Sequence, residues 1–157
     1  MKALIVYYSR TGTTKKMAEL IAEEARSAGL EIDLLSVSEV RPEQLLDYEG
    51  IIMGSPTYYG TLAAELKELL DKSISFHGKL DGKIGAAFSS AANIAGGNES
   101  TILSILEAML IHGMIIQGDP KGDHYGPVAI GQIDQRCETN CKRFAQRFAK
   151  LVKEKRS

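Results

Sequence analysis

Two kinds of apolar pattern alternate along the chain from one end to the other. Short and nearly continuous apolar runs are typical of strands that are covered on both faces of a sheet. Such runs lie at residues 3–8, 50–54 and 83–89. Residues 31–37 are more polar, so we expect them to form a strand at the edge of the sheet. A fifth strand begins at 114–116 and, after an interruption at 119–126, resumes at 127–130.

Between these runs, apolar residues recur at spacings of three and four, which predicts amphipathic helices. The first helix carries Met17, Leu20, Ile21, Ala25 and Ala28. Gly29 follows this stripe directly, and a glycine at that position commonly ends a helix. Two further stripes consist of Leu62, Leu66, Leu69 and Leu70, and of Ile102, Ile105, Leu106, Met109 and Leu110. A last helix is expected at 134–153.

Strands that alternate with helices pair in parallel through right-handed crossovers. The pattern therefore predicts an α/β fold, a three-layer sandwich with a five-stranded parallel sheet between layers of helices. No repeat, linker or shift in composition divides the chain, so we expect one domain over residues 1–157. Ligands of such sheets bind beyond the carboxyl ends of the strands. The loops after the first, third, fourth and fifth strands are thus the candidate functional loops.

Charge and composition narrow the expected partners and location. The chain has 19 basic and 20 acidic residues, a net charge of −1, which gives no reason to expect nucleic acid or a membrane as a partner. No apolar run approaches the ~20 residues of a membrane-spanning helix. The N-terminal residues lack the pattern of a secretory signal, so we expect a cytoplasmic protein. Cys137 and Cys141 continue the apolar stripe of the last helix and are expected to be core thiols rather than metal ligands.

The loop after the first strand is rich in hydroxyl groups and leads directly into a helix. Its residues are Ser9, Arg10, Thr11, Gly12, Thr13 and Thr14. Hydroxyls and backbone N–H groups at a helix N-terminus form a suitable cradle for a phosphate. An ordinary helix cap is the alternative, because serine and threonine are favoured there too. Lys15 and Lys16 favour the phosphate, since cations in the first turn oppose the helix dipole unless an anion is bound.

Neither of the common glycine-rich nucleotide motifs fits this loop, so we predict a site for a single terminal phosphate. The loop after the third strand contains Pro56, Thr57, Tyr58, Tyr59 and Gly60. Its two rings are suited to stack on a planar ligand, and they would otherwise expose a sizeable apolar patch. The loop after the fourth strand offers Ser89, Ser90, Ala91, Asn93 and Gly96. A loop that only enters a helix would have a similar composition, so this segment is open to both interpretations.

These loops carry a resemblance to a known family. Residues 9–14 resemble the FMN phosphate loop of flavodoxins, and residues 54–60 resemble the segment that lines the isoalloxazine ring in the same superfamily. Over nearly its whole length the chain is most similar to the tryptophan-repressor-binding protein A family of NAD(P)H:quinone oxidoreductases. Further segments that carry this likeness are 88–90, 96–97, 111–114 and 125–126. The resemblance implies a flavodoxin-like fold with strand order 2-1-3-4-5, with FMN as cofactor and NAD(P)H as electron donor.

The resemblance also adds His112 and Tyr125 to the expected FMN site. His112 follows a helix that runs away from the flavin at about 1.5 Å per residue. We therefore expect it either to reach the flavin of a neighbouring subunit, as Phe76 and His77 would, or to be an ordinary helix end. The first alternative predicts a homo-oligomer, a dimer or tetramer, with flavins near subunit interfaces.

Two functions are compatible with the resemblance. One is an oxidoreductase that passes electrons from NAD(P)H through FMN to a quinone or similar acceptor. Because the flavin performs the chemistry, we name no catalytic residue and expect no metal. The other is a flavodoxin-type electron carrier that docks to a redox protein. Such carriers are usually strongly acidic, unlike this chain, whereas the connection between Ser36 and Tyr48 is shorter than in the longer quinone reductases.

Overall fold

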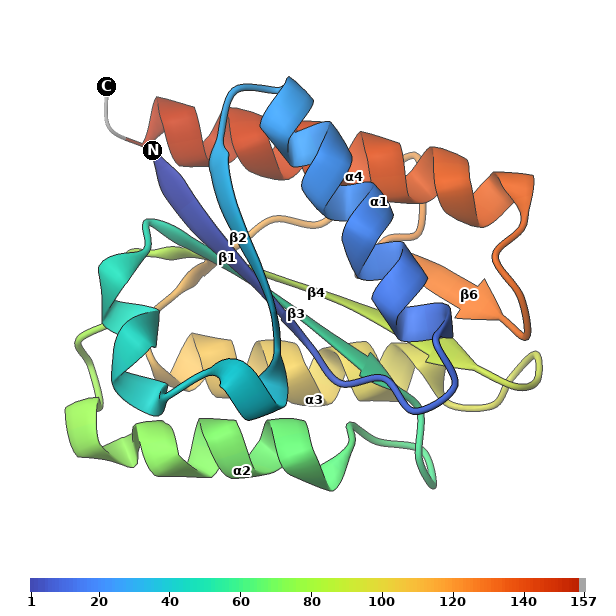
Figure 1. Cartoon of the computed structure of the whole chain (residues 1–157), viewed down its shortest axis with the longest axis horizontal. Helices are drawn as coiled ribbons and strands as arrows, with labels where there is room; N and C mark the ends of the chain where they lie inside the picture. Colours follow the sequence, from blue (N-terminus) through green and yellow to red (C-terminus); the bar gives the residue numbers. More distant parts are fainter. Residues whose placement is uncertain (156–157) are drawn as a thin grey trace.

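The computed structural model describes residues 1–155 and shows a parallel sheet between two layers of helices (Figure 1). Residues 156–157, the end of the expected domain, lie outside the described part. The strands are β1 (Lys2–Tyr7), β2 (Glu31–Ser36), β3 (Gly50–Pro56), β4 (Ile84–Ala91), β5 (Ile115–Ile116) and β6 (Val128–Ile130). The helices are α1 (Thr13–Ser27), α2 (Ala64–Lys72), α3 (Asn98–Ile111) and α4 (Gln135–Glu154). Short 3-10 helices are η1 (Val37–Glu39), η2 (Pro42–Asp47) and η3 (Ser73–Phe76).

The sheet has the order β2-β1-β3-β4-β5, and β6 also pairs with β4. β5 pairs with Ile84 and Gly85 at the start of β4, whereas β6 pairs with 89–91 at its end, all in parallel. The two short strands thus share one position at the sheet edge, which confirms the interrupted fifth strand. The predicted strand order is confirmed as well, and the more polar β2 lies at the opposite edge.

Each face of the sheet is covered by its own apolar core. α1 and α4 cover one face through residues such as Met17, Ile21 and Phe148, while α2 and α3 cover the other through residues such as Leu66 and Ile105. Figure 1 shows the two helix layers above and below the sheet. Cys137 and Cys141 are fully buried in the first core, which confirms the prediction that they are core thiols.

A close approach between neighbouring strands shapes the centre of the sheet. Phe88 on β4 is fully buried and lies opposite Gly54 of β3 in the register. A Cβ on Gly54 would lie 2.0 Å from the Phe88 ring, far inside van der Waals contact. Only glycine therefore fits at position 54, since the Phe88 ring fills the space that a side chain would need.

Some predicted boundaries were wrong. The stripe that begins at Leu62 was expected to lie wholly on a helix, but α2 begins at Ala64. Leu62 is buried in the preceding connection, where the Ser55 hydroxyl accepts a hydrogen bond from the Ala63 N–H at 2.8 Å and holds the chain extended. β3 and β4 also continue further than predicted. Their backbone pairing extends through Pro56 opposite Ser90, because backbone hydrogen bonds do not depend on the polarity of the side chains.

Within residues 1–155, no helix combines the length and the hydrophobicity that crossing a bilayer requires.

Candidate functional site

The carboxyl ends of the strands bring the loops after β1, β3, β4 and β6 together at one edge of the sheet (Figure 1). The backbone joins them in series. Tyr8 N–H donates to the Gly54 carbonyl at 3.0 Å, and Thr57 N–H donates to the Ser90 carbonyl at 2.7 Å. Gly131 N–H donates to the Ala91 carbonyl at 2.8 Å. The predicted functional loops are therefore neighbours in space, and hydrogen bonds hold them in one arrangement.

The start of α1 has an open backbone and no side-chain cap. Gly12 precedes the helix with a φ of 105°, a conformation that favours glycine, and a Cβ there would meet nothing within 4 Å. The Ser9 hydroxyl accepts from Gly12 N–H at 3.1 Å, whereas no side chain caps the helix itself. The first N–H groups of a helix have no partner within the helix. The open backbone at Gly12 therefore leaves these donors accessible to a ligand.

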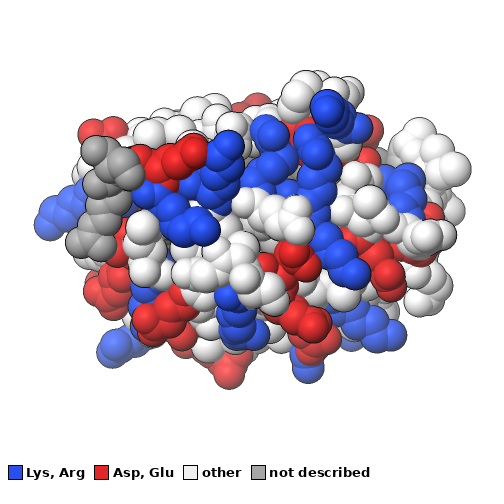
Figure 2. Space-filling model, turned by 90° about the horizontal axis from the view of Figure 1, so that it is seen from above, with Lys and Arg blue, Asp and Glu red and all other residues white. Residues whose placement is uncertain are grey.

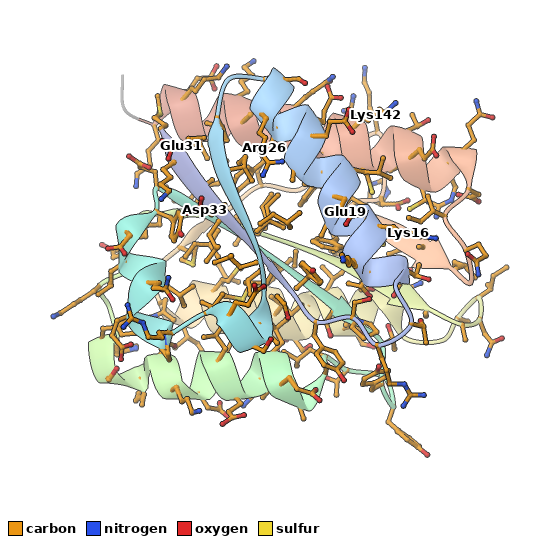
Figure 3. The ribbon with its side chains drawn as sticks, viewed as in Figure 1. Lys16, Glu19, Arg26, Glu31, Asp33 and Lys142 are labelled. Atoms are coloured by element: carbon orange, nitrogen blue, oxygen red, sulfur yellow. The ribbon has the colours of Figure 1, made fainter. Side chains whose placement is uncertain are left out.

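The charges in this first turn differ from those of the other α-helices in the described chain. The first turns of α2, α3 and α4 contain Glu65, Glu99 and Glu138, which suit the positive end of a helix dipole. α1 has no acidic residue there and carries Lys15 and Lys16 instead. Figure 3 shows Lys16 on the first turns of α1. This end of α1 is thus the one whose charges favour an external anion.

The structure divides the predicted hydroxyl groups into two sets. The hydroxyls of Thr14 and Ser90 are buried and hydrogen-bonded to each other at 2.9 Å. The buried Ser89 hydroxyl donates to Asn98 Oδ1 at 2.8 Å. Because buried polar groups need such partners, these side chains fasten α1, β4 and α3 together and do not open toward the loop surface. Of the first loop, Arg10 and Thr11 are exposed, and Thr13 is partly exposed with its hydroxyl 3.4 Å from the Gly131 carbonyl.

The loop after β3 ends in a tight turn that presents an aromatic ring. Tyr58 and Thr61 exchange backbone hydrogen bonds of 2.9 and 3.2 Å around Tyr59 and Gly60, which both have positive φ. A positive φ is strained for tyrosine, and the Tyr59 side chain is fully exposed. Within residues 1–155, the amides of Tyr59 and Gly60 have no hydrogen-bond partner, whereas those of Thr57 and Tyr58 are already used.

Tyr8 belongs to this site although the pattern of the sequence placed it in the first strand. Its ring meets the Tyr58 ring edge to face, with centroids 6.2 Å apart. Burial, followed by a hydrogen bond with Glu65, raises the pKa of the Tyr8 phenol. A signal was present, since Tyr8 is the last residue of an apolar run and directly precedes the phosphate-type loop.

The loop after β4 lies against the turn after β3. The Ser100 hydroxyl donates to the Gly60 carbonyl at 2.6 Å, and a Cβ on Gly97 would lie 2.9 Å from Gly60 Cα. Gly96 N–H donates to the Asn93 carbonyl at 3.2 Å, which closes the exposed tip of the loop. Ala91 lies at the base of this tip. These contacts make the two loops adjoining walls of one site.

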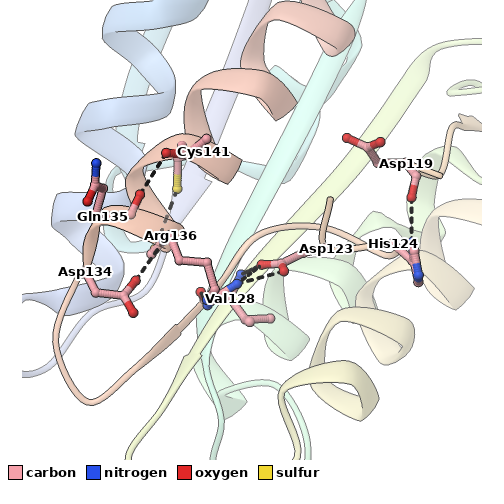
Figure 4. A network of polar contacts seen from close by, with 10 residues as sticks. Asp119, Asp123, His124, Val128, Asp134, Gln135, Arg136 and Cys141 are labelled. Carbon is pink, nitrogen blue, oxygen red and sulfur yellow. Dashed lines mark hydrogen bonds and ion pairs between the residues drawn. The ribbon is translucent and has the colours of Figure 1, made fainter. Parts of the chain in front are cut away.

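Tyr125 lies at the side of the site, in the segment that separates β5 from β6. Two ion pairs join this segment to α4: Arg136 with Asp123 at 2.8 Å, and Arg143 with Asp119 at 2.5 Å. Hydrogen bonding to Arg143 lowers the pKa of Asp119 below its usual range. Figure 4 shows the first of these pairs, together with the hydrogen bond from His124 to the Asp119 backbone. Tyr125 itself is half exposed and shares a hollow with Glu99 of the first turn of α3.

His112 is not brought to these loops. It follows the last residue of α3, the end of the helix that lies opposite the loops, and is buried beside Phe76 and His77. The Ser73 hydroxyl donates its proton to the Leu70 carbonyl at 2.6 Å, so at 2.7 Å it accepts from His112 Nε2–H. His112 Nδ1 then carries a lone pair and has no partner. To reach a neighbouring subunit, both His112 and Phe76 would have to leave these buried positions.

This environment predicts that His112 makes the fold sensitive to acid. Burial, and then the neighbouring His77, lowers the pKa of His112. An unfolded chain takes up this proton near pH ~6.5, so His112 contributes stability above that pH and the contribution is lost as the pH falls below it. Between about pH 7.5 and 5.5, the free energy of unfolding of the wild type should fall by up to about 1 kcal/mol more than that of His112→Gln. Urea unfolding of both proteins measures this difference, and equal losses would contradict the assignment.

Comparisons with known proteins agree on one family. A family model described as a flavodoxin domain matches residues 4–100. A flavodoxin from Clostridium saccharobutylicum is 39% identical over 161 residues, which cover 98% of this chain and 99% of the relative. An NAD(P)H dehydrogenase (quinone) from Sinorhizobium fredii is 41% identical over 154 residues, which cover 84% of this chain and 77% of the relative. A solved flavodoxin from the domain Archaea has a TM-score of 0.82 at 30% identity and covers 98% of this chain and 99% of its own. The resemblance to flavodoxins and to quinone reductases is thus confirmed.

Proposed function

The chain belongs to the flavodoxin family, and from this premise we propose that it binds FMN at the carboxyl edge of its sheet and transfers electrons through it. The observation that carries the proposal is the start of α1, which offers free N–H groups, an unobstructed glycine and two lysines, with no acidic residue in the turn. A phosphate supplies the negative charge that these groups lack. The residues present therefore fit the cofactor that the family implies.

The phosphate would lie against Gly12 and the N–H groups of Thr13 and Thr14, with the hydroxyls of Thr11 and Thr13 beside it. The buried hydrogen bond between Thr14 and Ser90 would hold this loop in place from the protein interior. The dianion would be partly neutralised by the helix N-terminus and by Lys15 and Lys16, and this attraction orients the rest of the molecule.

The flavin ring would lie against the turn after β3 and the loop after β4. The exposed Tyr59 ring is suited to cover one face of it, and the unpartnered amides of Tyr59 and Gly60 are suited to donate to its polar edge. Pro56 and Thr57 would form the base of this wall, and Asn93 and Gly96 lie in the facing loop. When bound, FMN supplies the electron-transfer chemistry, and the protein's residues bind it, orient it and exclude water from one side.

We propose an NAD(P)H:quinone oxidoreductase as the first form of this function. The near-neutral net charge favours it, because the carriers that the resemblance brings in are usually strongly acidic, and this chain has a net charge of only −1. The relatives named NAD(P)H dehydrogenase (quinone) support the same form. A quinone would be the small-molecule acceptor, and a homo-oligomer, a dimer or tetramer, stays a prediction from the resemblance.

A flavodoxin-type electron carrier is the second candidate, and chain length favours it. The match spans 99% of the Clostridium flavodoxin but only 77% of the Sinorhizobium quinone dehydrogenase. The connection between β2 and β3 consists of only η1, η2 and their flanking residues. In this form, the carboxyl edge would dock to a redox protein instead of a small substrate.

Titration of the apoprotein with FMN tests whether the chain binds the cofactor, and anaerobic addition of NADH or NADPH then distinguishes the reductase from the carrier. We expect one FMN per chain, bleaching of its yellow absorbance by one of the nicotinamides and recovery of the colour when a soluble quinone is added. Failure to bind FMN would overturn the whole proposal. Binding without bleaching would exclude the reductase and leave the carrier, which a reduced redox protein should then reduce.

A further inference from the structure

A pair of hydroxyl groups joins α3 to the turn after β3 inside the candidate site. The Thr101 hydroxyl of α3 donates to the Thr57 hydroxyl at 3.0 Å. Thr101 is fully buried, whereas Thr57 is partly exposed and lies beside Gly97 of the loop after β4. The pair therefore connects the protein interior with the wall against which the flavin ring is proposed to lie.

Burial determines the direction of this hydrogen bond. A hydroxyl group has one proton, and a buried polar group needs a partner. Within residues 1–155, Thr57 Oγ1 is the one partner of the Thr101 hydroxyl. If Thr57 were the donor, the Thr101 proton would be buried without an acceptor, which is a costly arrangement. Thr101 is therefore the donor, and the proton of Thr57 is not used in this bond.

Two further contacts fix the position of the Thr57 hydroxyl. The Thr57 N–H donates to the Ser90 carbonyl at 2.7 Å, which holds the backbone. The Thr57 methyl group packs beside Gly97, where a Cβ would lie only 3.1 Å from it. With its methyl group at Gly97 and its oxygen at Thr101, this β-branched side chain is held in one rotamer. Within residues 1–155 its hydroxyl proton has no acceptor, so the proton is left for a ligand.

The walls around this hydroxyl contain no positively charged side chain. Residues 54–61 and 89–111, which include the turn after β3, the loop after β4 and α3, have neither lysine nor arginine. Figure 2 shows lysine and arginine side chains gathered on a different face, over α1 and α4. A reduced flavin carries more negative charge than an oxidised one, and these walls offer it only uncharged donors such as hydroxyl and amide groups.

From these observations we infer that Thr101 is a positioning residue that raises the reduction potential of the bound flavin through Thr57. The Thr57 oxygen accepts on its inner side, so its O–H bond points to the outer side. There, beside the unpartnered amides of Tyr59 and Gly60, the proton is a donor to the polar edge of the flavin. Such a donor binds the reduced form more strongly than the oxidised form. The inference rests on the proposed function, since it requires FMN at this edge.

A second hydroxyl pair on the same helix has no proton to offer. Thr61 donates to the Ser104 hydroxyl at 3.2 Å, and Ser104 in turn donates to the Thr101 carbonyl at 2.8 Å. Both protons are thus used within the protein, although this pair also joins α3 to the end of the turn after β3. Ser104 is therefore a matched control for a contact that only holds the two elements together.

The dissociation constants of oxidised and reduced FMN test the inference. Thr57→Val removes the donated proton and keeps the shape of the side chain. It should raise the constant of reduced FMN about tenfold more than that of oxidised FMN, which lowers the two-electron midpoint potential by about 30 mV. Thr101→Val keeps the Thr57 hydroxyl but frees its orientation, so it should change the same ratio about threefold. Thr101→Ser keeps the donor and should restore the wild-type ratio.

Because Thr101 acts through Thr57, adding Thr101→Val to Thr57→Val should not change the ratio further. Ser104→Ala should leave the ratio at its wild-type value. Fluorescence titration and equilibration with a redox dye measure these quantities, and thermal unfolding of each apoprotein reports whether it is folded. Thr57 is partly exposed, so Thr57→Val keeps the test decisive even if Thr101→Val does not fold.

The outcomes separate this inference from the proposed function. A wild type that does not bind FMN would overturn both. If the wild type binds FMN but Thr57→Val, or a folded Thr101→Val, keeps the wild-type ratio, the inference alone is wrong. An effect of Ser104→Ala as large as that of Thr101→Val would also overturn it, because any contact between α3 and the turn would then suffice.

Discussion

Replacing Thr13 with glutamate should weaken FMN binding at least 100-fold while making the apoprotein slightly more stable. The two effects have opposite signs because they act on the same helix end. A glutamate in the first turn of α1 interacts favourably with the helix dipole, by about 0.3–1 kcal/mol, and should raise the thermal midpoint by about 1–4 °C. The same charge would lie beside the proposed phosphate, and two like charges about 4 Å apart near a protein surface repel each other by about 4 kcal/mol.

A matched control separates this local effect from a change in net charge. Ser75→Glu adds the same charge at an exposed position of η3, which lies at the end of the sheet opposite the Gly12 loop. It should leave the FMN dissociation constant unchanged. Fluorescence titration with FMN and calorimetry of the apoprotein measure both quantities. If Thr13→Glu binds FMN as tightly as the wild type, the phosphate does not lie at the start of α1.

Gly54→Ala should lower the free energy of unfolding by about 3 kcal/mol, the upper end of what an added methyl group costs in a packed core. The new Cβ would lie 2.0 Å from the Phe88 ring. Phe88 is fully buried at the centre of the sheet and cannot move aside without displacing its neighbours. The same steric change should also weaken FMN binding, because Gly54 accepts the hydrogen bond from Tyr8 N–H that positions the first loop.

A double-mutant cycle identifies the cause. Phe88→Leu should be destabilising alone but should relieve the clash, so that the double variant loses at least 1 kcal/mol less than the sum of the single changes. Gly78→Ala is the control, because a Cβ at Gly78 meets nothing within 4 Å. Its φ of 79° costs about 1–2 kcal/mol for alanine, and Phe88→Leu should not relieve that cost. Urea unfolding of the wild type, the three single variants and the two double variants measures both cycles. Strict additivity of Gly54→Ala with Phe88→Leu would refute the steric explanation.

The order of the elements was predictable from the sequence because local periodicity reports it. Continuous apolar runs marked the strands, and three- and four-residue spacing marked the helices. Even the interruption of the fifth strand was visible between residues 116 and 128, as was the polar character of the edge strand β2. The start of α1 was recognisable for the same reason, since a helix N-terminus is a local feature whose hydroxyl and lysine residues follow one another in the chain.

The roles of single side chains were not predictable in this way. Thr14 and Ser90 are 76 residues apart, and their hydrogen bond depends on how α1 packs against the end of β4. Ser89 likewise faces inward to Asn98. Tyr8 lies at the site because its backbone N–H pairs with the Gly54 carbonyl between the neighbouring strands β1 and β3. Each of these contacts depends on register between distant segments, which no local pattern contains.

By itself, then, the sequence determined the α/β alternation, the loops that carry the candidate site and the hydroxyl and lysine residues from which we propose that the first of them binds an anion, because all three follow from neighbouring residues. Only the tertiary structure decided which hydroxyls are buried, that His112 lies away from the loops, and that Thr101 reaches Thr57. The physical reason is that a residue's type and spacing set its local conformation, whereas its burial and partners depend on packing between elements far apart in the chain.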